Sequence, residues 1–295
     1  MKRPLLVFIL LAFGLSWAIM SPVWFDGGLG SPLMALSAPL MMLTPTLGVL
    51  GVWAVTRTPA REWAGQTGLT LGERRRRTGG LVLAAWLGVP ALALLAVGVS
   101  AVLGLVSLDL GQFSLYRAAI EAGGVRAPAD LGTAAVLQLV VATVAGPVLN
   151  AVLVFGEEWG WRGWLVPRLV SSNGVLIGLV FSGAVWGLWH APLTLLGYNY
   201  PRLGSWAALC FIGFCVLAGM LLGWLRLRTG SIWPAVVAHG SLNAIVPQTL
   251  LLGDAAAPPN EFLAGLTGLT GWVLLALTGA ALLRLYPARR PQPVG

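Results

Sequence analysis

The sequence predicts an all-α fold, a polytopic bundle of about eight transmembrane helices in a single membrane domain over 1–295. Of the 295 residues, 57% are hydrophobic and only 9% are charged, whereas a soluble domain carries about 25% charged residues. So few charges cannot cover a water-facing surface. The longest polar stretches, 57–79 and 108–130, are too short for an independent soluble core. The expected surroundings of the chain are therefore a lipid bilayer.

Eight apolar runs are long enough, at about 20 residues, to cross a bilayer. They are 4–24, 33–56, 80–107, 131–155, 174–196, 205–225, 231–252 and 264–285. The first run follows Lys2 and Arg3, as the core of a signal peptide would, but Trp17 and Met20 stand where small residues should mark a cleavage site. We therefore expect an uncleaved first span.

Small residues recur four apart in two of these runs, at Gly183 and Gly187 and at Gly219 and Gly223. This spacing places small side chains on one face of a helix and lets two membrane helices approach closely. The pattern is common in membrane proteins, so it predicts packing and not a function.

The basic residues stand at the ends of the apolar runs. With eight spans and an internal N-terminus, 15 of the 18 basic residues fall inside, as expected of cytoplasmic segments. They are Lys2, Arg3, Arg57, Arg61, Arg74, Arg75, Arg76, Arg77, Arg162, Arg168, Arg226, Arg228, Arg284, Arg289 and Arg290. We expect both termini on the cytoplasmic side of a cell membrane and, despite a net charge of +8, no nucleic-acid partner. One lysine against 17 arginines indicates a GC-rich bacterial genome.

Two carboxylates differ from the acidic residues of the loops. Glu157 and Glu158 directly follow the apolar run Val148–Phe155, among glycines and tryptophans. Charged groups at membrane depth are costly and usually face a partner or a cavity. On a helix, Glu158 pairs with Arg162 four residues later, while Glu157 points about 100° away. One carboxylate would be neutralised and the other could act as a general base; two interfacial glutamates with a simple ion pair are the alternative.

The only two histidines, His190 and His239, lie within or at the ends of predicted spans. His239 and Asn243 are four residues apart and share a helix face. A lone buried histidine is more often a packed core residue. Together with the two glutamates and the arginine, however, these residues supply the groups needed to activate water and hold an oxyanion.

These six candidate catalytic residues fall into three motifs that resemble those of the CPBP family, which groups CAAX proteases with bacteriocin-processing enzymes and is also called the Abi family. Residues 157–162 match its EExxxR motif, 186–190 resemble FxxxH, and 239–243 resemble HxxxN/D. The motif-bearing core covers about 145–250, and the layout is similar to the type II CAAX prenyl protease. Trp186 stands where the second motif usually has phenylalanine, and we interpret this aromatic side chain as a packing group.

The resemblance implies an intramembrane endopeptidase. Glu157 would be the general base and would polarise a water molecule with His190, while His239 and Asn243 would hold the oxyanion. The remaining glutamate and arginine of the first motif would position it. In eukaryotic relatives the substrate is a prenylated CaaX protein, whereas a bacterial enzyme need not recognise a prenyl group. The expected partner is a membrane-anchored or lipidated protein or peptide.

Metal dependence is left open by the resemblance, because family members have been described both as metalloproteases and as metal-independent glutamate proteases. We favour a site without metal or other cofactor. The alternative is an open zinc site in which Glu157, His190 and His239 supply three protein ligands, although the chain has no HExxH motif.

Two further functions stay open. One is a non-proteolytic bacteriocin-immunity or scaffold protein with the same fold. The other is a proton-coupled transporter that uses the glutamates and histidines as a relay; it predicts internal repeats, which the sequence does not show.

Overall fold

The computed structural model describes residues 2–288, and every regular element in this range is a helix. The predicted all-α fold is confirmed. Extended pairing within the described residues is limited to one isolated antiparallel bridge, between Leu108 and Gly253. Arg289 and Arg290, which the predicted topology assigns to the inside, lie outside the described residues.

The chain forms two compact units, and each unit combines segments that are distant in sequence. Unit 1 contains the residues up to Val82, Val152–Val236 and the residues from Thr278 onward. Unit 2 contains Leu83–Ala151 and Val237–Leu277. The prediction of a single domain over 1–295 stays a prediction.

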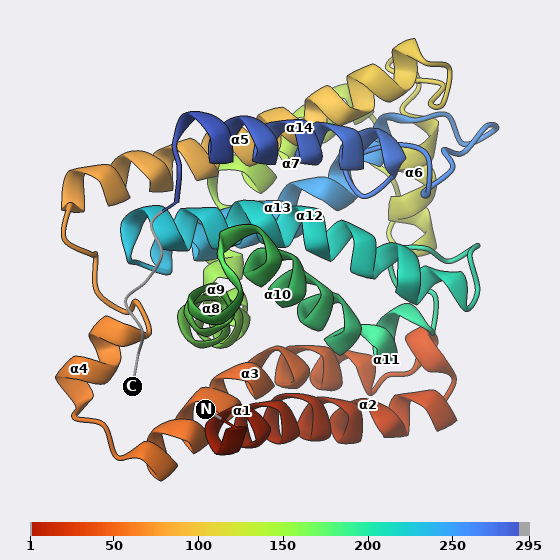
Figure 1. Ribbon diagram of the computed structural model, residues 1–295. Coiled ribbons are helices and arrows are strands. Elements are labelled where there is room, and N and C mark those ends of the chain that lie inside the picture. Colours follow the sequence, from red (N-terminus) through yellow and green to blue (C-terminus); the bar gives the residue numbers. More distant parts are fainter. Residues whose placement is uncertain (1, 289–295) are drawn as a thin grey trace. The chain divides into compact units, whose positions relative to one another are not determined.

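Unit 1 holds the N-terminal helices and those that carry the first two motifs (Figure 1). Its elements are α1 (Lys2–Ile9), the π-helix η1 (Leu10–Gly14), α2 (Leu15–Phe25), the 3₁₀-helix η2 (Gly28–Gly30), α3 (Met34–Thr56), α4 (Ala60–Gln66), the π-helix η3 (Trp159–Leu165), α9 (Val166–Asn173), α10 (Val175–Trp189), α11 (Ala191–Thr194) and α12 (Trp206–Thr229). The α1–η1–α2 run packs along α3, and α10 packs along α12.

Unit 2 holds α6 (Ser114–Ala122), α7 (Leu131–Val144) and the 3₁₀-helix η4 (Leu250–Leu252). Four further helices run from one unit into the other: α5 (Arg75–Val102), α8 (Gly146–Glu158), α13 (Trp233–Thr249) and α14 (Leu269–Leu285). The third motif therefore lies in unit 2, on α13.

Several helices match the predicted spans. Five stretches of the described residues are long and apolar enough to cross a membrane: Arg3–Phe25, Met34–Thr56, Arg75–Val102, Trp206–Thr229 and Trp233–Leu252. A bent pair, Leu131–Val144 with Gly146–Asn173, makes a sixth if it is one span, and the apolar helices α10 and α14 are shorter. The chain is a multi-pass membrane protein, but the predicted count of about eight spans is not confirmed.

The predicted span 131–155 is not one straight helix. The run 131–155 is interrupted after α7, and the following helix is bent from it by 48°. Pro147 lies at the start of this second helix, and proline both lacks a backbone N–H and disfavours a helical conformation at the residue before it. The helix then continues past 155, through η3 and α9, to Asn173.

The predicted close approach of two helices is confirmed between α10 and α12. A Cβ atom on Gly183 would lie 2.5 Å from the Cα atom of Val216, and one on Gly187 would lie 2.6 Å from the Cα atom of Ile212. A Cβ atom on Gly219 would lie 3.1 Å from the Cα atom of Gly183. Only glycine permits this spacing of the two backbones.

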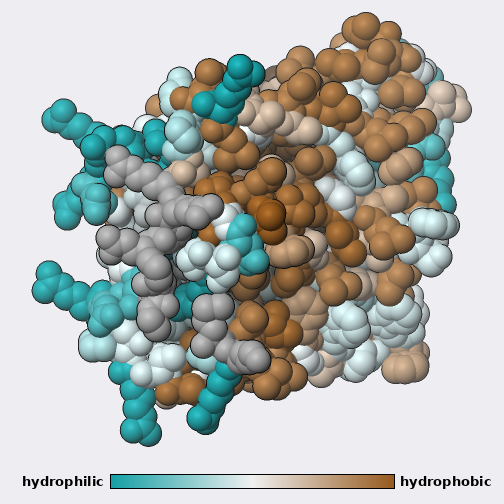
Figure 2. All heavy atoms as spheres, in the orientation of Figure 1, coloured by the Kyte–Doolittle hydropathy of each residue, from teal (hydrophilic) through white to brown (hydrophobic). Residues whose placement is uncertain are grey.

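The surface of unit 1 is divided by polarity. Exposed basic side chains occupy the α3–α4 turn, α4 and the segment that leads into α5, at Arg57, Arg61, Arg74, Arg75 and Arg76. Figure 2 shows hydrophilic side chains gathered over α4 and the start of α5, whereas hydrophobic side chains cover most of the remaining surface in view. An apolar surface with charges at its end is typical of a protein that sits in a bilayer.

Candidate active site

The first motif is buried because the glycines on either side of it let the chain approach α3 and the residue that follows α4. A Cβ atom on Gly156 would lie 2.6 Å from the carbonyl oxygen of Met42. One on Gly163 would lie 2.7 Å from the carbonyl oxygen of Thr67. The Thr46 hydroxyl also donates a hydrogen bond of 3.0 Å to the carbonyl oxygen of Gly156. The prediction that the span ends near 155 is therefore wrong, since these contacts hold the next residues inside unit 1.

The buried segment continues from α8 directly into the π-helix η3, Trp159–Leu165, all of whose residues are buried. π-Helical turns are rare and occur frequently at functional sites. The two carboxylates precede this turn, and Glu157 and Glu158 are 2% and 0% exposed. Both carboxylates therefore lie inside unit 1 and not at its surface, whereas the alternative of two interfacial glutamates is not tested by their burial.

Glu158 and Arg162 form the ion pair that their spacing predicts. Arg162 Nη1 lies 2.6 Å from Glu158 Oε1, and the arginine side chain is 1% exposed. Its guanidinium carbon also lies 4.0 Å from the ring centroid of Trp186, within the range of a cation–π contact. The predicted topology counts Arg162 among the cytoplasmic charges, and the structure shows that this residue is paired inside unit 1 and not exposed in a loop.

Glu157 has a different partner, on α10. The indole N–H of Trp186 donates a hydrogen bond of 2.8 Å to Glu157 Oε2. The interpretation of Trp186 as only a packing group is therefore wrong. The sequence contained one signal of this role, since tryptophan carries an N–H donor that phenylalanine lacks.

His190 follows the last residue of α10 and is buried, at 8% exposure. Its Nδ1 atom lies 2.9 Å from the carbonyl oxygen of Trp186. Because a carbonyl only accepts hydrogen bonds, Nδ1 carries the proton, and neutral His190 then has its lone pair on Nε2. The rings of Trp189 and Phe211 pack edge-on against the imidazole, with centroids 4.7 and 4.8 Å away, and so restrict its rotation.

Tyr198 lies close enough to Glu157 for the charge of this carboxylate to affect its pKa. The tyrosine side chain is 44% exposed. Partial desolvation by the surrounding protein, and to a smaller degree the negative charge of Glu157, raise the pKa of Tyr198, so its hydroxyl group stays protonated at neutral pH. Nothing in the spacing of the motifs pointed to this residue.

The structure thus brings four of the six predicted residues together in unit 1, around Trp186. His239 and Asn243 lie on α13 in unit 2, where the histidine is buried and the asparagine is exposed. Next to them, a Cβ atom on Gly240 would lie 2.7 Å from the carbonyl oxygen of Pro147, so that α13 and α8 are in close contact within unit 2. The prediction that all six residues form one site stays a prediction.

The three predicted zinc ligands do not all belong to one unit. Glu157 and His190 belong to unit 1 and His239 belongs to unit 2. Among the described residues, no group of three or more His, Cys, Asp or Glu side chains is arranged to hold a metal ion. The alternative of a zinc site at Glu157, His190 and His239 stays a prediction.

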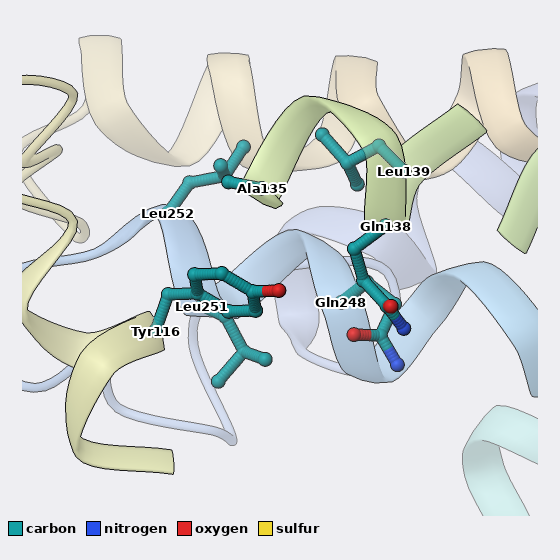
Figure 3. A pocket seen from close by; sticks show the side chains of 7 residues that line it. All are labelled: Tyr116, Ala135, Gln138, Leu139, Gln248, Leu251 and Leu252. Atoms are coloured by element: carbon teal, nitrogen blue, oxygen red, sulfur yellow. The ribbon is translucent and has the colours of Figure 1, made fainter. Parts of the chain in front are cut away.

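Unit 2 contains a separate small pocket with a cavity volume of about 10 Å³, close to the space that a single water molecule needs. Its lining comes from α6, α7, α13 and η4: Tyr116, Ala135, Gln138, Leu139, Gln248, Leu251 and Leu252. Figure 3 shows the amide groups of the two glutamines beside each other and the tyrosine hydroxyl directed toward them. None of the six predicted residues lines this pocket.

The sequence model of the family described as "Type II CAAX prenyl endopeptidase Rce1-like" matches residues 132–245. This range contains all three motifs, and it begins one residue after the start of α7 and ends within α13. A search of curated proteins gives no significant match.

Proposed function

We propose that this chain, in which residues 132–245 form a domain of the Rce1-like type II CAAX prenyl endopeptidase family, hydrolyses a peptide bond of a membrane-associated or lipidated protein. One observation carries the proposal. Of two adjacent buried carboxylates, Glu158 is neutralised by Arg162, while Glu157 is held by a neutral donor on the helix that also supplies His190. Such an arrangement brings one carboxylate and one imidazole to the same tryptophan, and these are the two groups that the activation of a water molecule requires.

In the proposed mechanism, Glu157 and His190 activate a water molecule. The water donates one hydrogen bond to Nε2 of His190, and Glu157 takes the other proton as the water oxygen attacks the scissile carbonyl carbon. The carbonyl π electrons move to its oxygen and give a tetrahedral oxyanion. When the C–N bond breaks, Glu157 returns its proton to the leaving amine nitrogen. The products are a carboxyl group and an amine, and the carboxylate is restored.

Two residues of the third motif are proposed to stabilise the intermediate. His239 and Asn243 both carry side-chain N–H groups that can donate to the oxyanion. Their spacing of four residues on α13 directs both side chains to one face of that helix. Loss of a single donor of this kind lowers kcat by about 10²–10³-fold in other hydrolases.

The proposed substrate has a membrane-buried tail and a scissile bond at the cytoplasmic side. This proposal rests on cytoplasmic termini and on the basic residues around α4, which are expected to face the cytoplasm. The composition supports a bacterial source, so that recognition of a lipidated or apolar tail is proposed without requiring a prenyl group.

The first test is cleavage of a lipidated reporter peptide by the purified protein. Glu157→Gln keeps the shape and the hydrogen-bonding capacity of the side chain but removes the base, so we expect turnover to fall by at least about 10²-fold. Glu121→Gln is the matched control, because it makes the same chemical change on the exposed surface of α6. Unchanged turnover in Glu157→Gln would refute the role of this residue.

Metal content, measured by mass spectrometry on the same sample, tests the water-activating groups. Full activity without bound metal and in the presence of a chelator is the result expected for Glu157 and His190 acting alone. Loss of activity on chelation, with recovery on addition of zinc, would instead make them metal ligands. Absence of cleavage in both conditions would favour the non-proteolytic alternative, and pH-driven flux in proteoliposomes would favour the transporter.

A further inference from the structure

We infer that Trp186 is a positioning residue that holds the Glu157 carboxylate in a fixed orientation through its indole N–H group. This inference rests on the proposed function, because it treats Glu157 as the base. Trp186 itself needs no contact with the substrate or with the reacting water.

Trp186 contacts members of both motifs in unit 1. Its indole N–H donates to Glu157 Oε2 at 2.8 Å. Its carbonyl oxygen accepts from His190 Nδ1 at 2.9 Å. Its ring lies against the guanidinium group of Arg162, 4.0 Å from the ring centroid. One residue of α10 therefore links the proposed base, the second water-activating group and the cation that neutralises Glu158.

The hydrogen bond to Glu157 matters because the carboxylate is only 2% exposed. A buried carboxylate requires compensating donors, and hydrogen bonds to a charged acceptor are roughly twice as strong as those between neutral groups. The Nη1 atom of the adjacent cation, Arg162, is bonded to Glu158. Holding Oε2 fixes the plane of the carboxylate, and with it the direction from which Glu157 can take a proton.

The tryptophan departs from the usual second motif, in which phenylalanine occupies this position. A phenyl ring fills part of the same space but has no N–H donor. The indole donor is therefore a property of this chain and not of the motif as such. It is also protected from water, since Trp186 is buried in α10.

The sharpest test compares Trp186→His with Trp186→Phe. Both variants replace the indole by a smaller ring, but in histidine the Nε2 atom occupies the place of the indole Nε1 atom and can donate a hydrogen bond. We expect kcat to fall by roughly tenfold to a hundredfold in Trp186→Phe, because small misplacements of reacting groups have effects of this size. The KM should stay within about twofold, and Trp186→His should recover part of the lost kcat.

Trp224→Phe is the matched control. Trp224 is also buried in unit 1, and its indole N–H donates 2.9 Å to the carbonyl oxygen of Tyr286. This variant loses the same ring volume and one hydrogen bond, and we expect it to keep the kcat of the wild type. Equal kcat values in Trp186→His and Trp186→Phe, or an unchanged kcat in Trp186→Phe, would overturn the inference.

Thermal unfolding provides a second readout that needs no substrate. Trp186→Phe should lower the melting temperature more when residue 157 is Glu than when it is Gln, because the loss of one donor costs a buried charge more than it costs a neutral amide. An equal decrease in both backgrounds would contradict the inference. If the wild type cleaves no reporter, the proposed function fails, while this comparison still decides whether Trp186 holds Glu157.

Discussion

The ion pair between Glu158 and Arg162 is among the most buried charged contacts in unit 1. Removing two charges from water is costly, and their attraction repays that cost only with close geometry and further contacts. The geometry is close, since the charged atoms are 2.6 Å apart, and the guanidinium also faces the Trp186 ring. The stability of the pair therefore depends on the presence of both partners.

Substitution of one partner should consequently harm the protein more than substitution of both. Glu158→Ala leaves Arg162 charged and buried, and we expect a loss of about 3–5 kcal/mol in the free energy of unfolding. The double variant Glu158→Ala with Arg162→Met removes the charge and should recover most of this loss. Denaturant unfolding in detergent micelles measures both values. A double variant as unstable as the single one would show that the stranded charge is not the cause.

For single residues, the sequence predicts those contacts that depend only on the spacing of residues along one helix. Glu158 and Arg162 are four residues apart, so helical geometry alone brings them together. Trp186 and Glu157 are separated by 29 residues, and their hydrogen bond depends on how α10 packs beside the first motif. No periodicity within either segment contains that information.

The packing of α10 against α12 determines where Trp186 and His190 lie. The two helices approach most closely where Gly183 of α10 faces Val216 and Gly219 of α12. The small-residue pattern predicted this approach because it is a property of each helix surface by itself. The break after α7 was not predicted, because an apolar run has the same hydropathy whether its helix is straight or bent, and membrane helices often accommodate proline.

A methyl group added where α10 crosses α12 should therefore displace the candidate active-site residues that α10 carries. In Gly183→Ala the added carbon would lie 2.5 Å from the Cα atom of Val216, so α10 must shift. Overpacking of this kind costs about 1–3 kcal/mol, and the displaced helix should also lower the cleavage rate. Gly79→Ala is the control, because nothing lies within 4 Å of its new carbon. Equal unfolding midpoints for the two variants would refute the packing argument.

For the whole molecule, the composition of the sequence was sufficient to predict a helical membrane protein. Each apolar residue adds independently to the hydropathy of a segment, so spans are found without knowledge of long-range contacts. The division into two units and the burial of Arg162 are different, because both arise from contacts between residues that are distant in sequence. Even without Arg162, the predicted inside segments keep a large excess of basic residues over Arg117, Arg126 and Arg202 outside.

The predicted orientation in the membrane rests on this excess and can be tested directly. Glu73 and Arg126 are exposed residues of the two longest polar stretches, which the topology places on opposite sides. We expect Glu73→Cys to react with a membrane-impermeant maleimide only after cells are permeabilised, and Arg126→Cys to react in intact cells. Cys210 and Cys215 lie in the apolar helix α12, so a background with both replaced by serine serves as the control.

The outcome of this labelling bears on the substrate as well as on the topology. Cytoplasmic labelling of Glu73→Cys would place the basic surface around α4 at the inner leaflet, where a peptide with a membrane-buried tail and a cytosolic scissile bond would arrive. The reverse pattern would put most of the basic residues outside, against the positive-inside rule. It would also require that the proposed protease acts on peptides exposed at the outer side of the membrane.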